Sequence, residues 1–298
     1  MQVSVVIVTW NAGKFIKDCL DSVFAQTFND LDVIIIDNNS TDQTVRIMKN
    51  YLPHIRIIEN DTNQGFCFAN NQALAIARGN YVLTLNSDMI LDKQYIFYLK
   101  EYLDKNHALG MVQGKFLRTD KRTIDSLGLY LSPSKRLFDI AKGRADGPKY
   151  SKTQAIFGPC AAAAMYKREL LEEIKQGEEF FDNSFYFLVE DFDIAWRAKN
   201  KGWKAMFIPE AVCYHFRNSS KHSVKFKQYL SFRNRYFMLI KNLSLKAALG
   251  YSFYFLVYDL PRLFFLSLRN PYIPKAISEI LHSLPELSKK RCKHMRIK

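Results

Sequence analysis

The alternation of short apolar runs with amphipathic segments in the first third of the chain is the feature that most constrains the fold of this 298-residue sequence. Strand-length runs rich in Val and Ile lie at Val3–Thr9, 33–36, 55–58 and 81–85. Between them, apolar residues with helical spacing occupy 14–25, 42–51 and 65–78. Strands that alternate with helices at this spacing predict an α/β fold with a right-handed, doubly wound and mostly parallel sheet.

Polar and acidic residues come directly after three of the apolar runs. Asp37 ends the second apolar run, and Asn86-Ser87-Asp88 ends the fourth. A third acidic pair, Glu190-Asp191, follows the apolar segment 185–189. Open α/β sheets bind their ligands outside the carboxyl ends of their strands. The three motifs together therefore predict a site for a metal-bound diphosphate and a general base.

The first two motifs each allow two interpretations. The Asp37 carboxylate can accept from a base N–H or from ribose hydroxyls, or it can form an Asx turn that caps the next helix. Asp88 can hold a hard divalent cation that also binds substrate phosphates, because such a site needs few protein oxygens. Alternatively, Asp88 is only the polar end of a strand.

The third motif is predicted to supply the base. Two adjacent carboxylates beside bulky apolar residues are costly unless they are solvated, paired or used. Asp191 is the candidate that takes a proton from an attacking hydroxyl. Asp193 and Arg197 have i, i+4 spacing, which predicts a surface ion pair. His215 follows a predicted short strand and approaches either the metal and diphosphate or a purely structural partner.

The positive charge is concentrated near the C-terminus. The net charge is +14, and residues 221–298 hold 16 Lys+Arg against 3 Asp+Glu. Such a segment predicts an anionic partner, either a membrane surface or nucleic acid. Within it, Arg233-Asn234-Arg235 is interpreted either as a phosphate contact or as a solvated basic face. The uncharged aromatic stretch 247–258 is too short to span a bilayer and suits a core or a membrane interface.

Composition excludes some classes of protein. The five cysteines are scattered and form no Cys-x-x-Cys pair, which argues against a disulfide framework or a zinc site and fits a reducing compartment. The N-terminal apolar run has strand length and no basic leader, so no secretory signal is expected.

The motifs together resemble the family 2 inverting glycosyltransferases of GT-A fold, most closely the rhamnosyltransferase-like members that build surface polysaccharides. The resemblance covers roughly residues 1–240. It rests on Val3-Ser-Val-Val-Ile-Val-Thr-Trp-Asn11, Asp37-Asn-Asn-Ser-Thr-Asp42, Asn63-Gln-Gly-Phe66 with Ala69-Asn-Asn71, Leu85-Asn-Ser-Asp88 and Phe185-Tyr-Phe-Leu-Val-Glu-Asp-Phe-Asp-Ile-Ala-Trp-Arg197.

The resemblance implies roles for individual residues. The expected nucleotide-sugar site consists of Thr9, Asn11, Asp37, Asn39, Gly65, Asn86 and Asp88. Asp88 and His215 are expected at a divalent cation, Mg²⁺ or Mn²⁺, and Asp191 is expected to be the base. The metal motif reads Asn-Ser-Asp instead of Asp-x-Asp, and the glycine of the usual His-x-x-Gly-x-Ser is missing after His215.

The implied reaction moves a hexose or deoxyhexose from a nucleotide diphosphate to a glycan or lipid-linked glycan acceptor, with inversion. The Gln-x-x-Arg-Trp motif of processive synthases is absent, so addition of one or a few sugars is expected. Residues 1–220 are expected to form the catalytic domain, made of a nucleotide-sugar half (1–115), a loop-rich insert (116–155) and an acceptor and base half (156–220). Residues 221–298 are expected to form a mostly helical extension that holds the protein on the inner face of the plasma membrane.

Two rival interpretations remain at this point. One is an inactive scaffold that binds membrane or nucleic acid through the basic segment, although no nucleic-acid partner is expected for the transferase. The other is a nucleotidyltransferase of similar architecture. Such enzymes usually carry a Gly-rich, basic phosphate loop after the first strand, and Trp10-Asn-Ala-Gly-Lys14 is not one.

Overall fold

The computed structural model describes residues 2–217, 222–270 and 272–295, and it contains one ten-stranded mixed sheet. In spatial order its main strands are β10 (Gln154–Ile156), β12 (Lys204–His215), β6 (Leu109–Arg118), β11 (Ala163–Lys167), β4 (Tyr81–Asn86), β1 (Val3–Thr9), β2 (Leu31–Asp37) and β3 (Ile55–Glu59). The first four in sequence, β1 to β4, are mutually parallel, while β11 runs antiparallel between β4 and β6. The predicted doubly wound, mostly parallel sheet is confirmed.

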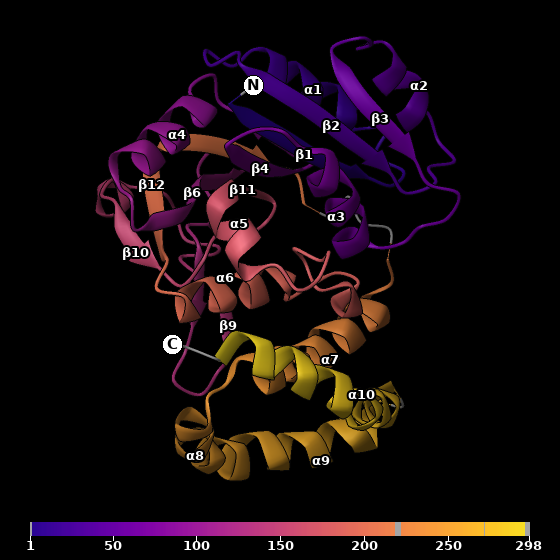
Figure 1. The fold of residues 1–298 in the computed structure, drawn as a ribbon, viewed down its shortest axis with the longest axis vertical. Coiled ribbons are helices and arrows are strands. Elements are labelled where there is room, and N and C mark those ends of the chain that lie inside the picture. The colour runs from indigo at the N-terminus through magenta and orange to yellow at the C-terminus, as the bar shows by residue number, and fades with distance from the viewer. Residues whose placement is uncertain (1, 218–221, 271, 296–298) are drawn as a thin grey trace.

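Helices cover both faces of the sheet (Figure 1). The helices α1 (Ile16–Phe24), α2 (Thr44–Lys49) and α4 (Tyr95–Lys105) pack on one face, and α3 (Phe66–Ile76), α5 (Arg168–Ile174) and α6 (Glu190–Asn200) pack on the other. Successive residues of a strand point to opposite faces, so the buried Val5 and Val6 enter different cores. Because both faces are covered, the strands read as continuous apolar runs.

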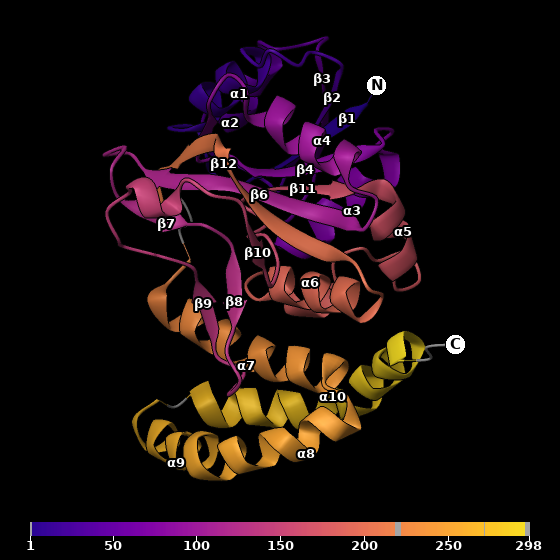
Figure 2. The same ribbon diagram turned by 90° about the vertical axis from the view of Figure 1, so that its left-hand side faces the viewer.

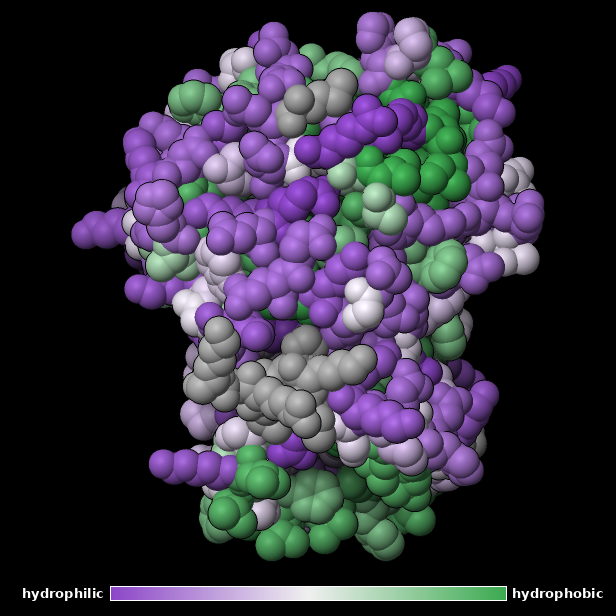
Figure 3. Space-filling view, viewed as in Figure 1, coloured by the Kyte–Doolittle hydropathy of each residue, from purple (hydrophilic) through white to green (hydrophobic). Residues whose placement is uncertain are grey.

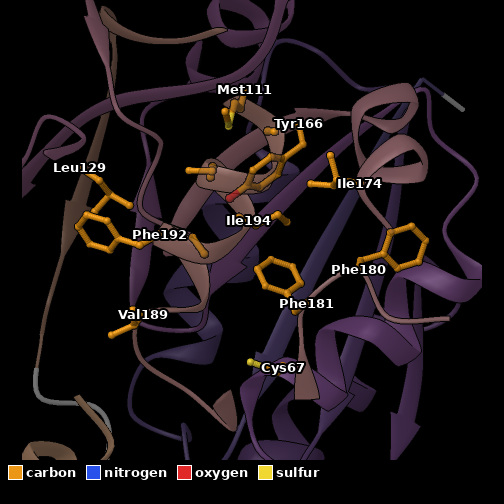
Figure 4. Close-up of a cluster of buried hydrophobic side chains, with 14 of the residues drawn as sticks. Cys67, Met111, Leu129, Tyr166, Ile174, Phe180, Phe181, Val189, Phe192 and Ile194 are labelled. Atoms are coloured by element: carbon orange, nitrogen blue, oxygen red, sulfur yellow. The ribbon is translucent and has the colours of Figure 1, made fainter. Parts of the chain in front are cut away.

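The core around α6 is aromatic. Phe181 and Phe192 lie near Ile194 on the face of the sheet that α3, α5 and α6 cover, and the Tyr166 side chain of β11 projects toward them (Figure 4). Phe181 is fully buried and Phe192 is 6% exposed. The start of α6, which carries the predicted base, therefore packs against buried apolar side chains.

The segment expected to be a loop-rich insert forms short strands joined by turns. It contains β7 (Ile124–Ser126), β8 (Leu129–Leu131), β9 (Leu137–Asp139) and a single 3₁₀ turn η1 (Pro148–Tyr150), and ends in β10. β7 joins the main sheet at β6, and β5 (Met89–Leu91) joins it at β12. The β8–β9 hairpin extends away from the sheet toward the C-terminal helices (Figure 2).

The apolar runs 203–208 and 212–214 predict two short strands, and this prediction is wrong because both belong to β12. Residues Lys204–His215 form one strand whose pairing with β6 shifts register between Ile208 and Val212. The intervening Pro209 and Glu210 produced the apparent break, and a bulge absorbs them.

The C-terminal extension is helical, as predicted. It comprises α7 (Val224–Asn242), α8 (Leu245–Tyr254), a π turn η3 (Phe255–Asp259), α9 (Leu260–Arg269) and α10 (Tyr272–Met295). α7 packs against both α6 and α10, and α8 with α9 forms the outer layer (Figures 1 and 2). Among the described helices, none is long and apolar enough to cross a membrane.

Candidate active site

The strand register brings three predicted residues to one edge of the sheet. Thr9 pairs with Asp37 across β1 and β2, and Val8 pairs with Asn86 across β1 and β4. All three strands are parallel, so their carboxyl ends open at the same edge.

A cavity of about 520 Å³ lies at this edge. The predicted site residues that line it are Thr9, Gly65, Asn86, Asp88, Asp191 and His215. Asn11, Asp37 and Asn39 do not line it. Instead Asn38, which the sequence interpretation passed over in favour of its neighbour, faces the cavity and donates from Nδ2 to the carbonyl of Gly65 at 3.1 Å.

Asp37 and Asn11 hold the loops beneath the cavity. The Thr9 hydroxyl donates to Asp37 Oδ1 at 2.8 Å, and the Ser40 backbone N–H donates to Oδ2 at 2.8 Å. Asn11 Oδ1 accepts from the Thr41 backbone N–H at 2.9 Å. Asp37 thus holds the loop that follows β2, but it does not cap α2, which begins at Thr44, so the helix-capping Asx turn is not formed. Asp37 is only 1% exposed. A contact from Asp37 or Asn11 to a nucleoside stays a prediction.

Asp88 lies in the turn between β4 and β5, next to His215 at the end of β12. Asp88 Oδ1 is 3.4 Å from Nε2 of His215, and Nδ1 of His215 is 2.8 Å from Oδ2 of Asp125. Burial alone would lower the pKa of His215, but the carboxylates of Asp125 and Asp88 raise it to about 9. Arg217 also pairs with Asp125. Asp125 was missed in the sequence because it lies in the segment interpreted as loop.

The pair formed by Asp88 and His215 fits a divalent cation once His215 has lost its proton, because only a neutral imidazole can bind a metal ion. One carboxylate and one imidazole are donors that Mn²⁺ accepts, and Asp125 on the far nitrogen is the arrangement that orients a metal-bound histidine. In the described ranges no group of three or more His, Cys, Asp or Glu side chains is arranged to hold a metal ion by itself. A cation here would need oxygens from a substrate diphosphate and water, which is common for Mg²⁺ sites.

The two carboxyls at the start of α6 differ in environment. Glu190 is 8% exposed, and burial together with the charge of Asp191 holds its pKa well above the usual 4.5. Asp191 is partly exposed to the cavity, and burial followed by the charge of Asp139 raises its pKa from 3.8 to about 7. A carboxyl with a pKa near neutrality is suited to accept a proton.

A strained loop delivers Asp191 to the cavity. Tyr186, Leu188 and Val189 all have positive φ, at 64°, 69° and 73°. Such backbone is costly for residues with side chains and persists only where the surroundings fix it. Here Asn234 of α7, fully buried, donates from Nδ2 to the carbonyls of residues 185, 187 and 188 at 2.8–2.9 Å.

Arg233-Asn234-Arg235 is thus neither a phosphate contact nor a solvated basic face. Arg233 pairs with Glu279 of α10, and Arg235 pairs with the buried Asp259. These two ion pairs lie within the extension. Arg233 also donates to the carbonyl of Ser184 at 2.8 Å and Arg235 to that of Lys135 at 2.9 Å, so these bonds, with those of Asn234, join the extension to the catalytic part.

Asp193 and Arg197 form a buried ion pair, which corrects the expectation of a surface pair. Their side chains are 1% and 0% exposed and lie 2.9 Å apart. Lys241 of α7 lies 3.0 Å from Asp193 and also contacts Asp182, and Lys290 of α10 lies 2.7 Å from Asp182. The fully engaged Asp193 is therefore not available as a base.

Aromatic rings close the other side of the cavity. Trp10 stacks on His222 with ring centroids 4.8 Å apart, and Phe187 stacks on His222 at the same distance. Gly65 has φ +87°, and a Cβ there would come 2.4 Å from the Tyr186 ring. Any larger residue at 65 would therefore both strain the backbone and displace a cavity wall.

Comparisons with known proteins agree with this geometry. The family profile described as "Glycosyl transferase family 2" matches residues 4–175. Chondroitin synthase of Escherichia coli is 34% identical over 133 residues, covering 44% of this chain and 18% of that enzyme. This chain therefore spans only a small part of that relative's length.

Two solved structures share the fold. The Staphylococcus aureus TarS fragment 1-349 in complex with UDP-GlcNAc gives a TM-score of 0.61 at 20% identity, covering 98% of this chain and 84% of that one. The mannosyltransferase of Pyrobaculum calidifontis in complex with GDP-Man and Mn²⁺ gives 0.59 at 16% identity, with the same coverage. The GT-A fold is confirmed, and the chain belongs to glycosyl transferase family 2.

Proposed function

We propose that this protein transfers a hexose or deoxyhexose from a nucleotide diphosphate sugar to a hydroxyl of a glycan acceptor, with inversion. The observation that carries the proposal is that Asp191 and Asp88 line the same cavity at the carboxyl edge of the sheet. Such a displacement requires a base whose pKa lies near neutral pH and a carboxylate on the side of the diphosphate, and both groups line this one cavity.

The donor would lie along the edge formed by β1, β2 and β4. Thr9, Asn38 and Asn86 offer polar groups to the nucleotide, and Trp10 offers an aromatic face. Asp88 and His215 would hold Mg²⁺ or Mn²⁺, whose charge neutralises the departing diphosphate. The named complexes of the structural neighbours with UDP-GlcNAc and with GDP-Man and Mn²⁺ support this assignment.

Asp191 would accept the proton of the acceptor hydroxyl as the new glycosidic bond forms and the bond to the diphosphate breaks. A single base and a single displacement invert the anomeric centre. Glu190 stays neutral because it is more deeply buried than Asp191 and lies next to its charge. Neutral Glu190 leaves Asp191 as the carboxylate of the pair that titrates near pH 7.

A screen of nucleotide sugars, read as release of nucleoside diphosphate, tests this proposal. The wild-type protein should release it with acceptor present, and NMR should show an inverted product. Asp191→Asn should lose this activity, whereas Asp18→Asn, an exposed carboxyl on α1, should keep it. Full activity of Asp191→Asn would show that another residue is the base, whereas no release from the wild type with any nucleotide sugar would support the inactive scaffold, in which function resides in the extension.

We further propose that the protein works in the cytoplasm, bound to the inner face of the plasma membrane, on a lipid-linked glycan. α8, η3 and α9 expose large apolar side chains, among them Leu249 at 77%, Phe264 at 70% and Leu268 at 73%. They form an apolar surface at the lower end of the molecule (Figure 3). Basic residues nearby, including Arg262 and Arg269, would draw this surface to anionic lipid, at about 1 kcal/mol each.

Sedimentation with lipid vesicles tests the membrane proposal. The protein should pellet with anionic vesicles, and salt should weaken binding without abolishing it, because the apolar contribution is not screened. Leu249→Ser with Phe264→Ser should remove binding, while Phe97→Ser on α4, where the ring is 41% exposed, should not. Equal pelleting with neutral and anionic vesicles, or none with either, would contradict the proposal.

A further inference from the structure

A second cavity of about 680 Å³ adjoins the catalytic one. Its walls are the tip of the β8–β9 hairpin, one face of α7, and parts of α9 and α10. Leu137, Phe138, Leu188 and Ser231 line both cavities. A ligand in the second cavity would therefore lie directly beside the place where Asp191 acts.

The hairpin tip is held in place by α7. Arg235 donates from Nε to the carbonyl of Lys135 at 2.9 Å and from Nη2 to the carbonyl of Ser134 at 3.3 Å. Lys135 itself has φ +57°, which turns the chain sharply at this point. The tip thereby presents Arg136 to the second cavity.

The second cavity is strongly cationic. Arg136, Lys227, Arg235 and Arg262 line it, and its lining includes no Asp or Glu. Arg235 is neutralised by the buried Asp259. For the other three, no carboxylate lies within ion-pair distance in the part of the chain that the structure describes. Three unpaired cations around one hollow favour an anion with several oxygens.

The same cavity also has an apolar side that leads outward. Phe232, Leu266 and Ile273 line it. Leu266 belongs to α9, whose neighbouring Phe265 and Leu268 are 50% and 73% exposed on the apolar surface. The cavity therefore lies between the apolar surface and the catalytic cavity, and it combines positive charge with apolar walls.

We infer that the second cavity binds the phosphate or diphosphate group of a lipid-linked acceptor. The inference rests on the proposed function, since it supplies that reaction with its acceptor. The anionic group would contact Arg136, Lys227 and Arg262, and the hydrocarbon would leave over α9 toward the membrane. The glycan would pass Leu137 and Leu188 to present its hydroxyl to Asp191.

Binding of farnesyl diphosphate, a short lipid diphosphate, tests the inference by calorimetry on the full chain. The triple variant Arg136→Gln, Lys227→Gln, Arg262→Gln should bind it at least about 10-fold more weakly, because charge-assisted hydrogen bonds are lost. The matched control removes three exposed lysines elsewhere: Lys93→Gln, Lys152→Gln and Lys201→Gln. The control should bind farnesyl diphosphate as the wild type does.

Inorganic pyrophosphate separates a lipid-linked ligand from a free anion. Wild-type protein should bind it more weakly than farnesyl diphosphate, because the apolar wall contributes nothing to it. Equal affinity for the two probes would overturn the lipid assignment. Unchanged binding of farnesyl diphosphate by the triple variant would overturn the site.

Slow hydrolysis of the sugar donor distinguishes this inference from the proposed function. Hydrolysis needs only the catalytic cavity, so the triple variant should release nucleoside diphosphate at the wild-type rate. A triple variant that hydrolyses donor normally but loses farnesyl diphosphate supports the inference. Failure of the wild type to use any donor would count against the proposed function, while the binding comparison still decides the second cavity.

Discussion

Asp191→Asn is expected to lower turnover and to raise stability at the same time. The pKa of Asp191 rises from 3.8 to about 7 on folding, because the carboxyl is buried and faces Asp139. The folded state therefore binds the proton more tightly, and ionisation reduces the free energy of unfolding as the pH rises between these two values. One pKa unit is worth about 1.4 kcal/mol, so the loss reaches at most about 4 kcal/mol above pH 7.

Asparagine avoids this loss because it carries no charge. Thermal unfolding should show Asp191→Asn more stable than wild type near pH 8, by about 1–4 kcal/mol, with a much smaller difference near pH 5. Turnover should fall roughly 10²–10⁴-fold, while nucleoside diphosphate affinity stays unchanged. Wild-type turnover should increase with pH and level off above a pKa of about 7, since the base acts in its ionised form.

Asp193→Asn, two residues along the same helix, is the matched control with the opposite sign. Asp193 has a pKa below its usual value because Lys241 and Arg197 outweigh its burial. Removing its charge leaves buried cations short of a partner and should destabilise the protein by about 3–5 kcal/mol. The reasoning is refuted if Asp191→Asn also destabilises near pH 8, or if its turnover stays within a few-fold of wild type.

Three further predictions concern other parts of the site. Asn234→Leu should lower turnover more than donor affinity, measured by steady-state kinetics and calorimetry, because three loop carbonyls lose their donor. Lys241→Met should destabilise by about 3–5 kcal/mol in denaturant unfolding, since Asp182 and Asp193 lose a shared cation. Mg²⁺ or Mn²⁺ should tighten nucleoside diphosphate binding in calorimetry, and Asp88→Ala should abolish the difference from chelator; equal affinity with and without metal in the wild type would contradict the assignment.

The first half of the sheet could be predicted because its strands are covered on both faces. Val3–Thr9 matches β1 at both ends, since every residue there has an apolar environment or a partner. Strand β6 escaped prediction because Gln113 and Lys115 interrupt its apolar pattern. Both are buried: Gln113 accepts from the Cys160 backbone N–H at 2.6 Å, and Lys115 pairs with Asp146. Periodicity does not reveal such distant partners.

Candidate site residues could be predicted where they follow an apolar run. Residues that only hold a neighbouring loop in place could not be predicted. Asp88 and Asp191 could be proposed from the sequence because each follows an apolar run, and the structure places both on the cavity, while their roles stay predictions. Asn234 was misinterpreted because its partners lie about 47 residues away, in a loop whose strain no sequence pattern displays. The sequence predicts Asn39 at the site, but Asn38 is the asparagine that lines the cavity. Asn39 has a positive φ, and this turn decides which of the two adjacent side chains faces the cavity.

Buried ion pairs and hydrogen bonds join the extension to the catalytic part. Lys241 of α7 and Lys290 of α10 neutralise Asp182, which is fully buried beneath α6. Without these two helices Asp182 and Asp193 would lose their lysines, and the loop before Asp191 would lose Asn234. The same α7 carries Lys227 and Arg235 into the second cavity. α7 therefore holds the loop before the proposed base on one side and borders the proposed acceptor site on the other. In this proposal, binding of the lipid-linked acceptor would be coupled to the position of Asp191, which a separable basic module would not require.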